Sequence, residues 1–274
     1  MKPMNLELYL KRVQYHDALE PTLAVLNAVQ RAHLKAIPYE NLNIHLGREL
    51  PLGATQAFEK IVVNGRGGWC YEMNGLLGWA LTEIGFEVQL LSSGVLRPDG
   101  TTPDGDHMIL RVSVEGGDYL ADAGFGDGAI HALPILEGKY RAGFLEYAME
   151  RDGEAWIMRN PPSSNTAGFR FSSKPRDLSY FAPRCTYLQT SSESGFVRTT
   201  VCQRITDSAL YTLRGAVLTT LTAHGKIEHT LQNAGEYRTT LHQIFKLQLE
   251  VTETEPLWER IWARHLEWLA RSLE

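Results

Sequence analysis

The chain has 274 residues, of which 43% are hydrophobic, so it is long enough to bury one large core or roughly two to three smaller ones. Its 27 basic and 32 acidic residues are spread along the sequence and give a formal net charge of -5. This distribution offers no basic patch that could hold a phosphate backbone, and we therefore expect no nucleic-acid partner.

Cysteine and histidine spacing bears on disulfides and metal sites. The three cysteines, Cys70, Cys185 and Cys202, form no C-x-x-C pair, and no pair of histidines at ligand spacing lies near them. Neither a disulfide framework nor a zinc site is indicated, and no metal is expected.

The first segment of the sequence does not have the pattern of a secretory signal. Glu7, Lys11 and Arg12 fall where such a signal needs an unbroken apolar core. No later apolar run reaches the roughly 18 residues that a membrane-spanning helix requires. We expect a soluble, cytoplasmic protein without a membrane partner.

The first third of the chain has helical periodicity. Apolar residues recur at i, i+3, i+4 and i+7 from Leu6 to Val13, and a second such run begins at Leu23, after Pro21 and Thr22. We therefore predict a helical unit over residues 1–86.

Beyond Glu87 the pattern changes to short apolar or alternating runs. VQLLS, HMILRVSV, DYLAD and AWIMR are separated by the turn-rich segments RPDGTTPDGD, EGG, RDG and NPPSSN, which is typical of antiparallel strands. After Phe196, the strand-like runs VRTTVCQRI and YTLRG precede a closing helix that is rich in tryptophan. These patterns predict an α+β protein with a helical N-terminal bundle, a central antiparallel sheet or barrel over residues 87–200, and a mixed α/β part over residues 201–274.

A cysteine lies at the expected start of one helix. Apolar residues after Cys70 recur at helical spacing up to Ile84, and Gly85 follows as a stop signal, so we expect a helix from Cys70 to Ile84. The free N–H groups and the positive end of the helix dipole would lower the thiol pKa of Cys70 from its ordinary value of roughly 8.5, which favours a nucleophile. A plain buried core cysteine is the other interpretation.

A nucleophilic cysteine needs a base and a third group that orients the base. His107 opens a strand directly after the turn PDGD, and Asp122 lies where the strand YLAD gives way to glycines, so a scaffold would hold both beside loops. Among the other histidines, His45 and His131 stay undecided. The remaining six have polar or surface-like neighbours: His16, His33, His224, His229, His242 and His265.

A hairpin test of this His–Asp pair succeeds only in part. A turn at Gly116 and Gly117 would pair Arg111 with Asp122 and leave His107 on the same face of the sheet. Four residues along a strand span roughly 13 Å. Contact between His107 and Asp122 would therefore need a bulge, a different register or non-neighbouring strands.

Four segments match one enzyme family in order and spacing. They are R-G-G-W-C-Y-E-M-N at residues 66–74, IPYENL at residues 37–42, the strand-opening His107, and DAGFG at residues 122–126. They cover roughly the first half of the chain, which in these segments resembles the arylamine N-acetyltransferases. The resemblance implies a triad of Cys70, His107 and Asp122, and a helical bundle, a β-barrel and an α/β lid in chain order.

The resemblance also implies an activity. The thiolate of Cys70 would take an acetyl group from acetyl-CoA and pass it to an arylamine, an arylhydrazine or a related amine by ping-pong chemistry. His107 would hold Cys70 as a thiolate and relay protons, and Asp122 would fix the tautomer of the imidazole. A monomer or a homodimer is expected.

Substrate contacts are implied in the same way. Gly124 and Gly126 would allow close approach of CoA, and Phe125 would line the amine pocket together with Tyr39 and Tyr71.

Glu40 and Arg66 could form a buried ion pair that supports the site, and the other interpretation is that each is solvated. The sequence departs from the family at Trp69, where tyrosine or phenylalanine is more frequent, and in the segment YFAPRCTYLQTSSESGF.

Two other classes of protein stay open. A transglutaminase-like or papain-like cysteine hydrolase uses the same three residue types in the same chain order. His107 and Asp122 lie only 37 and 52 residues after Cys70, which argues against papain, where the histidine lies well over a hundred residues after the cysteine. The second class is a binding module in which the triad is inert.

Overall fold

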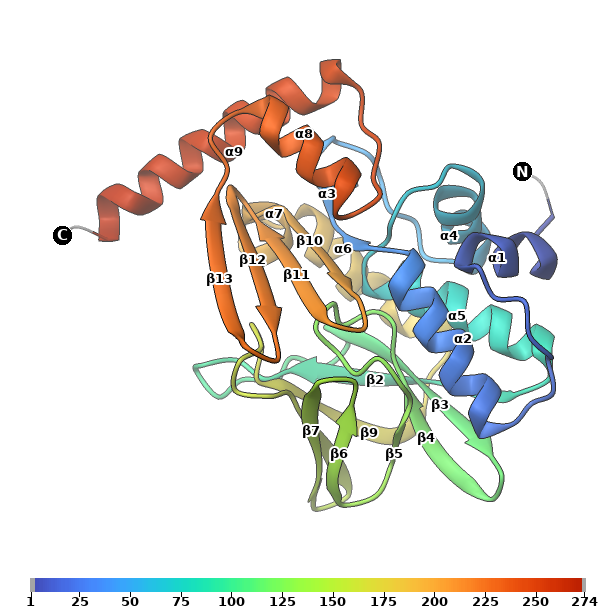
Figure 1. Cartoon of the computed structure of the whole chain (residues 1–274). Helices are drawn as coiled ribbons and strands as arrows, with labels where there is room; N and C mark the ends of the chain where they lie inside the picture. The colour runs from blue at the N-terminus through green and yellow to red at the C-terminus, as the bar shows by residue number, and fades with distance from the viewer. Residues whose placement is uncertain (1–2, 273–274) are drawn as a thin grey trace.

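A computed structural model describes residues 3–272 of the chain (Figure 1). Its first third is helical, as predicted, and side chains of Asn5 and Thr22 cap α1 and α2 by accepting hydrogen bonds from N–H groups of the first turn. The elements here are α1 (Leu6–Val13), α2 (Leu23–Ala36), α3 (Leu42–His45), α4 (Ala54–Phe58), the π-helical turn η1 (Glu59–Val63) and α5 (Cys70–Ile84).

Eight antiparallel strands form a strongly curved sheet that nearly closes into a barrel, below the helices in Figure 1. Their order across the sheet is β5-β4-β3-β2-β9-β8-β7-β6. They are β2 (Glu87–Val95), β3 (His107–Val114), β4 (Gly117–Ala121), β5 (Leu133–Pro134), β6 (Gly138–Ala142), β7 (Leu145–Asp152), β8 (Ala155–Arg159) and β9 (Gly168–Pro175). The strands predicted at VQLLS, HMILRVSV, DYLAD and AWIMR are confirmed as β2, β3, β4 and β8.

A second antiparallel sheet has the order β1-β10-β11-β12-β13. Its strands are β1 (Tyr39–Glu40), β10 (Val201–Ile205), β11 (Ala209–Arg214), β12 (Val217–Thr222) and β13 (Gly225–Thr230). Helices α8 (Ala234–Gln243) and α9 (Val251–Ser272) share a hydrophobic core with this sheet. Because β1 comes from the first third of the chain, the sheet joins distant parts of the sequence. The division at residues 86 and 200 stays a prediction.

The stretch expected to hold strands up to residue 200 also contains helices. These are the 3₁₀ turn η2 (Leu178–Phe181), α6 (Ala182–Thr190) and α7 (Gly195–Arg198). Pro183 occupies the first turn of α6, where its missing N–H leaves no helical bond unmade. The expectation of strands alone was therefore wrong for this segment.

Helix α5 joins the two layers of the molecule. It packs against the other N-terminal helices on one side and against β2 and β3 on the other, within one continuous hydrophobic core. Its N-terminal residue, Cys70, therefore lies at the junction of the helices, the barrel and the second sheet.

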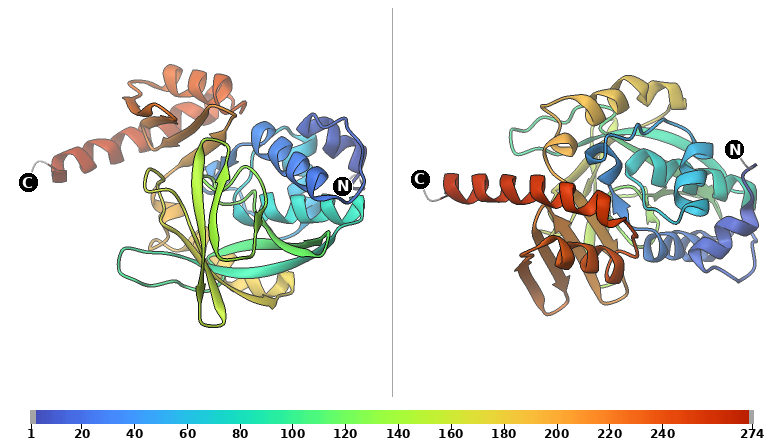
Figure 2. Two further views of the ribbon diagram at one scale, coloured as in Figure 1. Left: turned by 60° about the horizontal axis from the view of Figure 1, so that its bottom comes forward. Right: turned by 90° about the horizontal axis from the view of Figure 1, so that it is seen from above.

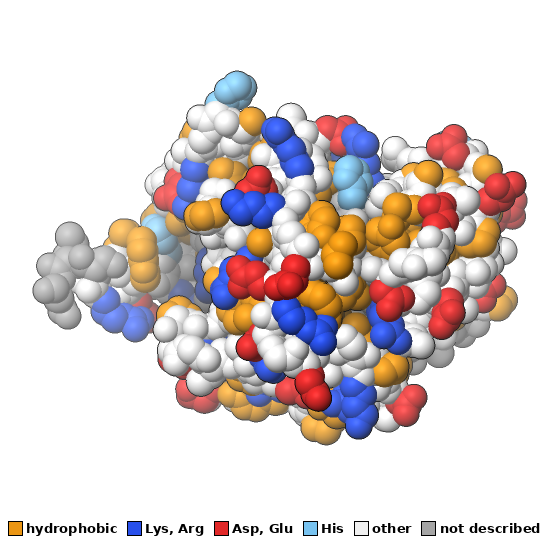
Figure 3. Space-filling model, turned by 90° about the horizontal axis from the view of Figure 1, so that it is seen from below, with side chains coloured by type: hydrophobic (Ala, Val, Ile, Leu, Met, Phe, Trp, Pro, Cys, Tyr) orange, Lys and Arg blue, Asp and Glu red, His pale blue; other side chains and the backbone are white. Residues whose placement is uncertain are grey.

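The surface of the molecule is marked by a projecting helix and by mixed charge. The C-terminal half of α9 extends away from the body of the molecule (Figure 2). On the underside of the barrel, acidic and basic side chains are interspersed rather than gathered by sign (Figure 3). Within residues 3–272, no helix is both long and apolar enough to pass through a bilayer.

Candidate active site

Cys70 is the first residue of α5, as the sequence predicts, and only 2% of it is exposed. The turn before it is fixed by Glu72, whose Oε2 accepts a hydrogen bond from the Trp69 N–H at 3.2 Å. Gly85 ends the helix in a left-handed conformation with φ of 110°. Both ends of the predicted helix are confirmed.

The ionisation of Cys70 differs from the expectation. Burial raises the pKa of the thiol, and the charges of Cys185, Asp122 and Asp106 raise it further. The backbone N–H of Tyr71 opposes this shift by hydrogen bonding to the sulfur. The helix N-terminus therefore does not by itself make a thiolate here, and a cation beside the sulfur would be needed to stabilise one.

His107 and Asp122 contact each other directly. His107 Nε2 lies 2.7 Å from Asp122 Oδ2, and both residues are buried. Nδ1 of His107 has no hydrogen-bond partner among residues 3–272. The imidazole also packs against the rings of Phe125 and Phe169, with centroids 4.9 and 5.2 Å away.

The contact is possible because the hairpin has a different register from the one tested on the sequence. Its turn residues are Glu115 and Gly116, with φ of 51° and 77°, and Val114 pairs with Gly117. Asp122 follows directly after Ala121, which pairs with Leu110, so it lies diagonally across from His107 rather than four residues away. The predicted turn at Gly116 and Gly117 was wrong.

Asn74 connects this pair to the cysteine helix. It lies one turn after Cys70 on α5, donates from Nδ2 to Asp122 Oδ1 at 2.8 Å, and accepts from the Ala123 N–H at 2.7 Å. The N–H of Gly124 donates to the same Oδ1 of Asp122 at 2.8 Å. Sequence analysis missed the role of Asn74, although its i+4 spacing from Cys70 places it on the same helix face.

The two glycines of DAGFG are required by packing within the protein. A Cβ on Gly124 would come within 2.8 Å of the Cys70 Cα, so this segment lies directly against the cysteine. A Cβ on Gly126, which has φ of 79°, would clash with the side chain of Gln203. Contacts of these glycines with CoA stay a prediction.

The predicted substrate-binding aromatics lie around this site. Phe125 is half-buried against the His107 ring, and the Tyr71 hydroxyl donates to the Gly105 carbonyl at 2.6 Å. Tyr39 is buried in β1, and burial together with the neighbouring Cys70 charge raises the pKa of its phenol. Their contact with an amine stays a prediction.

Glu40 and Arg66 form the expected ion pair, with Arg66 Nη2 and Glu40 Oε1 separated by 3.6 Å. The structure adds Lys60, whose Nζ lies 3.5 Å from Glu40 Oε1 and 2.7 Å from Glu72 Oε2. Lys60 and Arg66 lower the pKa of Glu40 against the effect of burial. The charges of two acidic and two basic side chains thus compensate one another near the start of α5.

One histidine was placed wrongly by its sequence context. His33 is completely buried rather than surface-like, with Nδ1 2.9 Å from the Tyr9 hydroxyl oxygen. The two undecided histidines, His45 and His131, are both half-buried. His45 also lines a cavity beside the second sheet.

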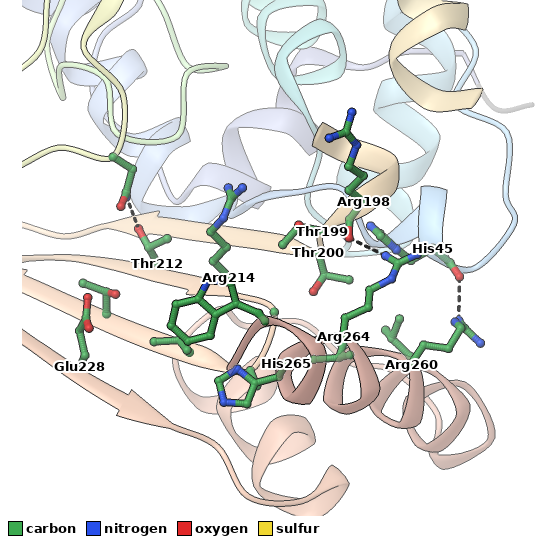
Figure 4. Close-up of a pocket in the computed structure, with 18 of the residues that line it drawn as sticks. His45, Arg198, Thr199, Thr200, Thr212, Arg214, Glu228, Arg260, Arg264 and His265 are labelled. Carbon is green, nitrogen blue, oxygen red and sulfur yellow. Dashed lines mark hydrogen bonds between the residues drawn. The ribbon is translucent and has the colours of Figure 1, made fainter. Parts of the chain in front are cut away.

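That cavity has a volume of about 500 Å³ and lies between β11, β12, α7 and α9. Arg214 on β11 and Arg264 on α9 approach it, whereas the side chain of Arg198 on α7 points away from them (Figure 4) and pairs with Glu193 at 3.1 Å. Among residues 3–272 the guanidinium of Arg214 has no hydrogen-bond or ion-pair partner. Within the same described range, no cluster of three or more histidine, cysteine or acidic residues could hold a metal ion.

Two sets of contacts connect the lining of the cavity to the region around Cys70. Thr212, which lines it, accepts a hydrogen bond at 3.3 Å from Gln203, the residue packed against Gly126. Thr199, also in its lining, follows Phe196 closely in sequence, and the Phe196 ring lies 5.4 Å from that of Trp69.

Comparison with known proteins identifies the family. A family model for N-acetyltransferases matches residues 22–254. Arylamine N-acetyltransferase 2 of Macaca mulatta is 30% identical to this chain, with 90% of this chain and 95% of that protein covered. The chain belongs to the arylamine N-acetyltransferase family.

Solved structures of this family agree in fold. The structure of Mycobacterium marinum arylamine N-acetyltransferase matches with a TM-score of 0.88 at 29% identity, covering 94% of this chain and 99% of that one. The structure of the same enzyme in complex with CoA matches with a TM-score of 0.87 at 28% identity. The predicted family, α+β fold and acetyltransferase class are thereby confirmed. The alternatives left open by the sequence were the cysteine hydrolase and the inert binding module, and neither is the class that these comparisons support.

Proposed function

We propose that the chain catalyses N-acetylation of arylamines or arylhydrazines by acetyl-CoA, in a ping-pong reaction through an acetyl group on Cys70. The observation that carries the proposal is the 2.7 Å contact between His107 and Asp122, held by Asn74 from the same helix face as Cys70. Membership of the arylamine N-acetyltransferase family supports it.

In the first half of the reaction, the Cys70 sulfur attacks the carbonyl carbon of the acetyl thioester. Because burial raises the pKa of this thiol, the proton needs a close acceptor, and Nδ1 of His107 is the nitrogen that Asp122 leaves available. The bond between the acetyl carbon and the CoA sulfur breaks, and the proton on His107 passes to the departing CoA thiolate.

In the second half, the amine nitrogen attacks the acetyl carbon on Cys70 and gives a proton to His107. The bond from that carbon to the Cys70 sulfur then breaks, which releases the amide and restores the starting cysteine–histidine pair. Asp122 stabilises the cationic imidazole in both halves and keeps its Nδ1 directed away from the carboxylate.

The cavity beside the second sheet suits the phosphate-bearing part of the donor. Its volume of about 500 Å³ and the unpartnered guanidinium of Arg214 fit an anionic ligand, and Arg264 adds positive charge from α9. From there the acyl group would reach Cys70 past Gln203 and the DAGFG segment. Phe125, half-buried against His107, would line the site of the aromatic acceptor.

The test is the intact mass of the protein after incubation with acetyl-CoA, and separately with propionyl-CoA and malonyl-CoA, before any amine is added. We expect one acetyl group on Cys70, lost on addition of aniline with formation of acetanilide. Cys70→Ser is the matched control and should gain no acyl group. Acetanilide formed without an acyl-enzyme would contradict the ping-pong route, and continuous hydrolysis of acetyl-CoA without amine would indicate a hydrolase.

A further inference from the structure

A second buried carboxylate lies five residues after Asp122. Asp127 is only 1% exposed, and its carboxylate accepts hydrogen bonds from Asn160 Nδ2 at 3.1 Å, the Asn165 N–H at 2.9 Å and Thr166 Oγ1 at 3.1 Å. All three donors belong to the loop between β8 and β9, which consists of residues 160–167. The carboxylate thus holds this loop in place.

This carboxylate is buried without a cation. Within residues 3–272 no lysine, arginine or histidine lies at ion-pair distance from Asp127, and burial raises its pKa to about 6 against the opposing hydrogen bonds from Asn165 and Thr166. An unpaired buried carboxylate is unfavourable unless hydrogen bonds satisfy it. An apolar side chain would fill this position at a smaller free-energy cost. We therefore take the hydrogen bonds that hold the loop in position to be what Asp127 contributes.

The loop held by Asp127 contacts the second sheet. Asn165 Nδ2 donates to Thr212 Oγ1 on β11 at 3.3 Å, and Asn165 lines the cavity together with Thr212 and Arg214. The other end of the loop leads into Phe169, whose ring packs on His107. Asn165 of this loop therefore lines the cavity, and the strand that follows the loop carries Phe169 against the imidazole.

We propose that Asp127 is a positioning residue for the acyl donor: it holds the loop over residues 160–167 so that Asn165 lines the cavity that contains Arg214, and CoA binds to a preformed site. This inference rests on the proposed function, because it takes acyl-CoA as the ligand of the cavity. The carboxylate acts through Asn165 and does not itself touch the donor. A loop that is already ordered reduces the ordering cost of binding.

The test compares Asp127→Ala, which removes every acceptor, with Asn165→Ala, which removes the side-chain bridge to Thr212 and leaves the carboxylate intact. CoA itself is the probe, with its dissociation constant measured by calorimetry, and hydrogen exchange is followed in residues 160–167. Asp152→Ala is the matched control, because Asp152 is an exposed barrel aspartate that pairs with Arg170.

We expect the CoA dissociation constant to rise about 5- to 30-fold in Asp127→Ala and to rise also in Asn165→Ala, with faster exchange in the loop. The KM for aniline at saturating donor should stay unchanged, which a general loss of structure would not allow. Unchanged CoA binding in both variants, or a rise only in the KM for aniline, would overturn the inference. If Asp127→Ala does not fold, the CoA dissociation constants of Asp127→Asn and Asn165→Ala test the inference by the same criteria.

Failure of this inference and failure of the proposed function give different results. Wild-type protein that is not acylated by acetyl-CoA contradicts the proposed function. Wild-type protein that is acylated, with variants that bind CoA as tightly as it does, contradicts only the role of Asp127.

Discussion

Two buried histidines lie in different parts of this molecule and have opposite surroundings. His33, in the helical layer, is 0% exposed, and its partner is the neutral hydroxyl of Tyr9. His107, between the helices and the barrel, is 2% exposed, and its partner is the carboxylate of Asp122. Burial lowers the pKa of His33 to about 3, and the charge of Arg12 adds to this shift.

Burial alone therefore does not distinguish the histidine proposed to be catalytic from a structural one. A phenol partner in an apolar core leaves His33 neutral over the whole physiological range. A carboxylate partner stabilises the cation that a proton transfer would leave on His107. The partner, rather than the degree of exposure, therefore separates the two histidines.

Matched substitutions test this difference most strongly. His107→Gln should lower the rate of aniline acetylation by roughly 10⁴- to 10⁶-fold, because it removes the group that relays the proton. His33→Gln should leave the rate per folded molecule within about threefold of wild type and lower only the stability. Steady-state rates, with far-UV circular dichroism to count folded protein, would measure both. A comparable loss of rate in the two variants would contradict the comparison.

The reactivity of the thiol sharpens the account of His107. Burial raises the pKa of Cys70, and under the proposed function the imidazole of His107 would oppose this effect. The midpoint of iodoacetamide labelling against pH should therefore rise by about 1–3 pH units from wild type to His107→Gln. Peptide mass would follow Cys70, with Cys185, whose pKa burial raises to about 12, as the internal reference. An unchanged midpoint would show that His107 does not act on the thiol.

A smaller effect is expected in the stability of the helical layer. The folded pKa of His33, about 3, lies below its ordinary value of 6.5, so the neutral ring is favoured on folding. This contribution is fully present above pH 6.5 and is lost as the pH falls from 6.5 toward 3, at about 1.4 kcal/mol per pH unit.

Urea unfolding of wild type and His33→Gln between pH 4 and pH 7 measures that loss. The free energy of unfolding should fall more steeply with decreasing pH in wild type. The difference in slope should reach up to about 1.4 kcal/mol per pH unit, the value for one bound proton. Parallel curves for the two proteins would mean that His33 is not held neutral by the fold.

The sequence predicted local features well. Helix α5 begins and ends where the periodicity and Gly85 place it, because such signals lie within a few residues of the element they define. His33 could have been recognised as buried, since it lies at i+7 from the buried Leu26 on α2. Its polar neighbours hid this pattern.

Features that depend on distant contacts were not predictable. The hairpin register was missed because Glu115, a residue other than glycine, takes a left-handed conformation in the turn. The hydrogen bonds of Asn74 and the ion pairs of Lys60 join segments that meet only after packing. A two-residue strand such as β1 is too short to have a periodicity of its own.

The central claim is that His107 and Asp122 act on Cys70 as one unit. The most direct measurement is the rate of CoA release on mixing with acetyl-CoA, without amine, in His107→Gln, Asp122→Asn and the double variant. We expect Asp122→Asn alone to be slower than wild type by on the order of 10⁴-fold, and the double variant to be within about twofold of His107→Gln. A double variant slowed by the product of the two single effects would show that the residues act independently and would contradict the account.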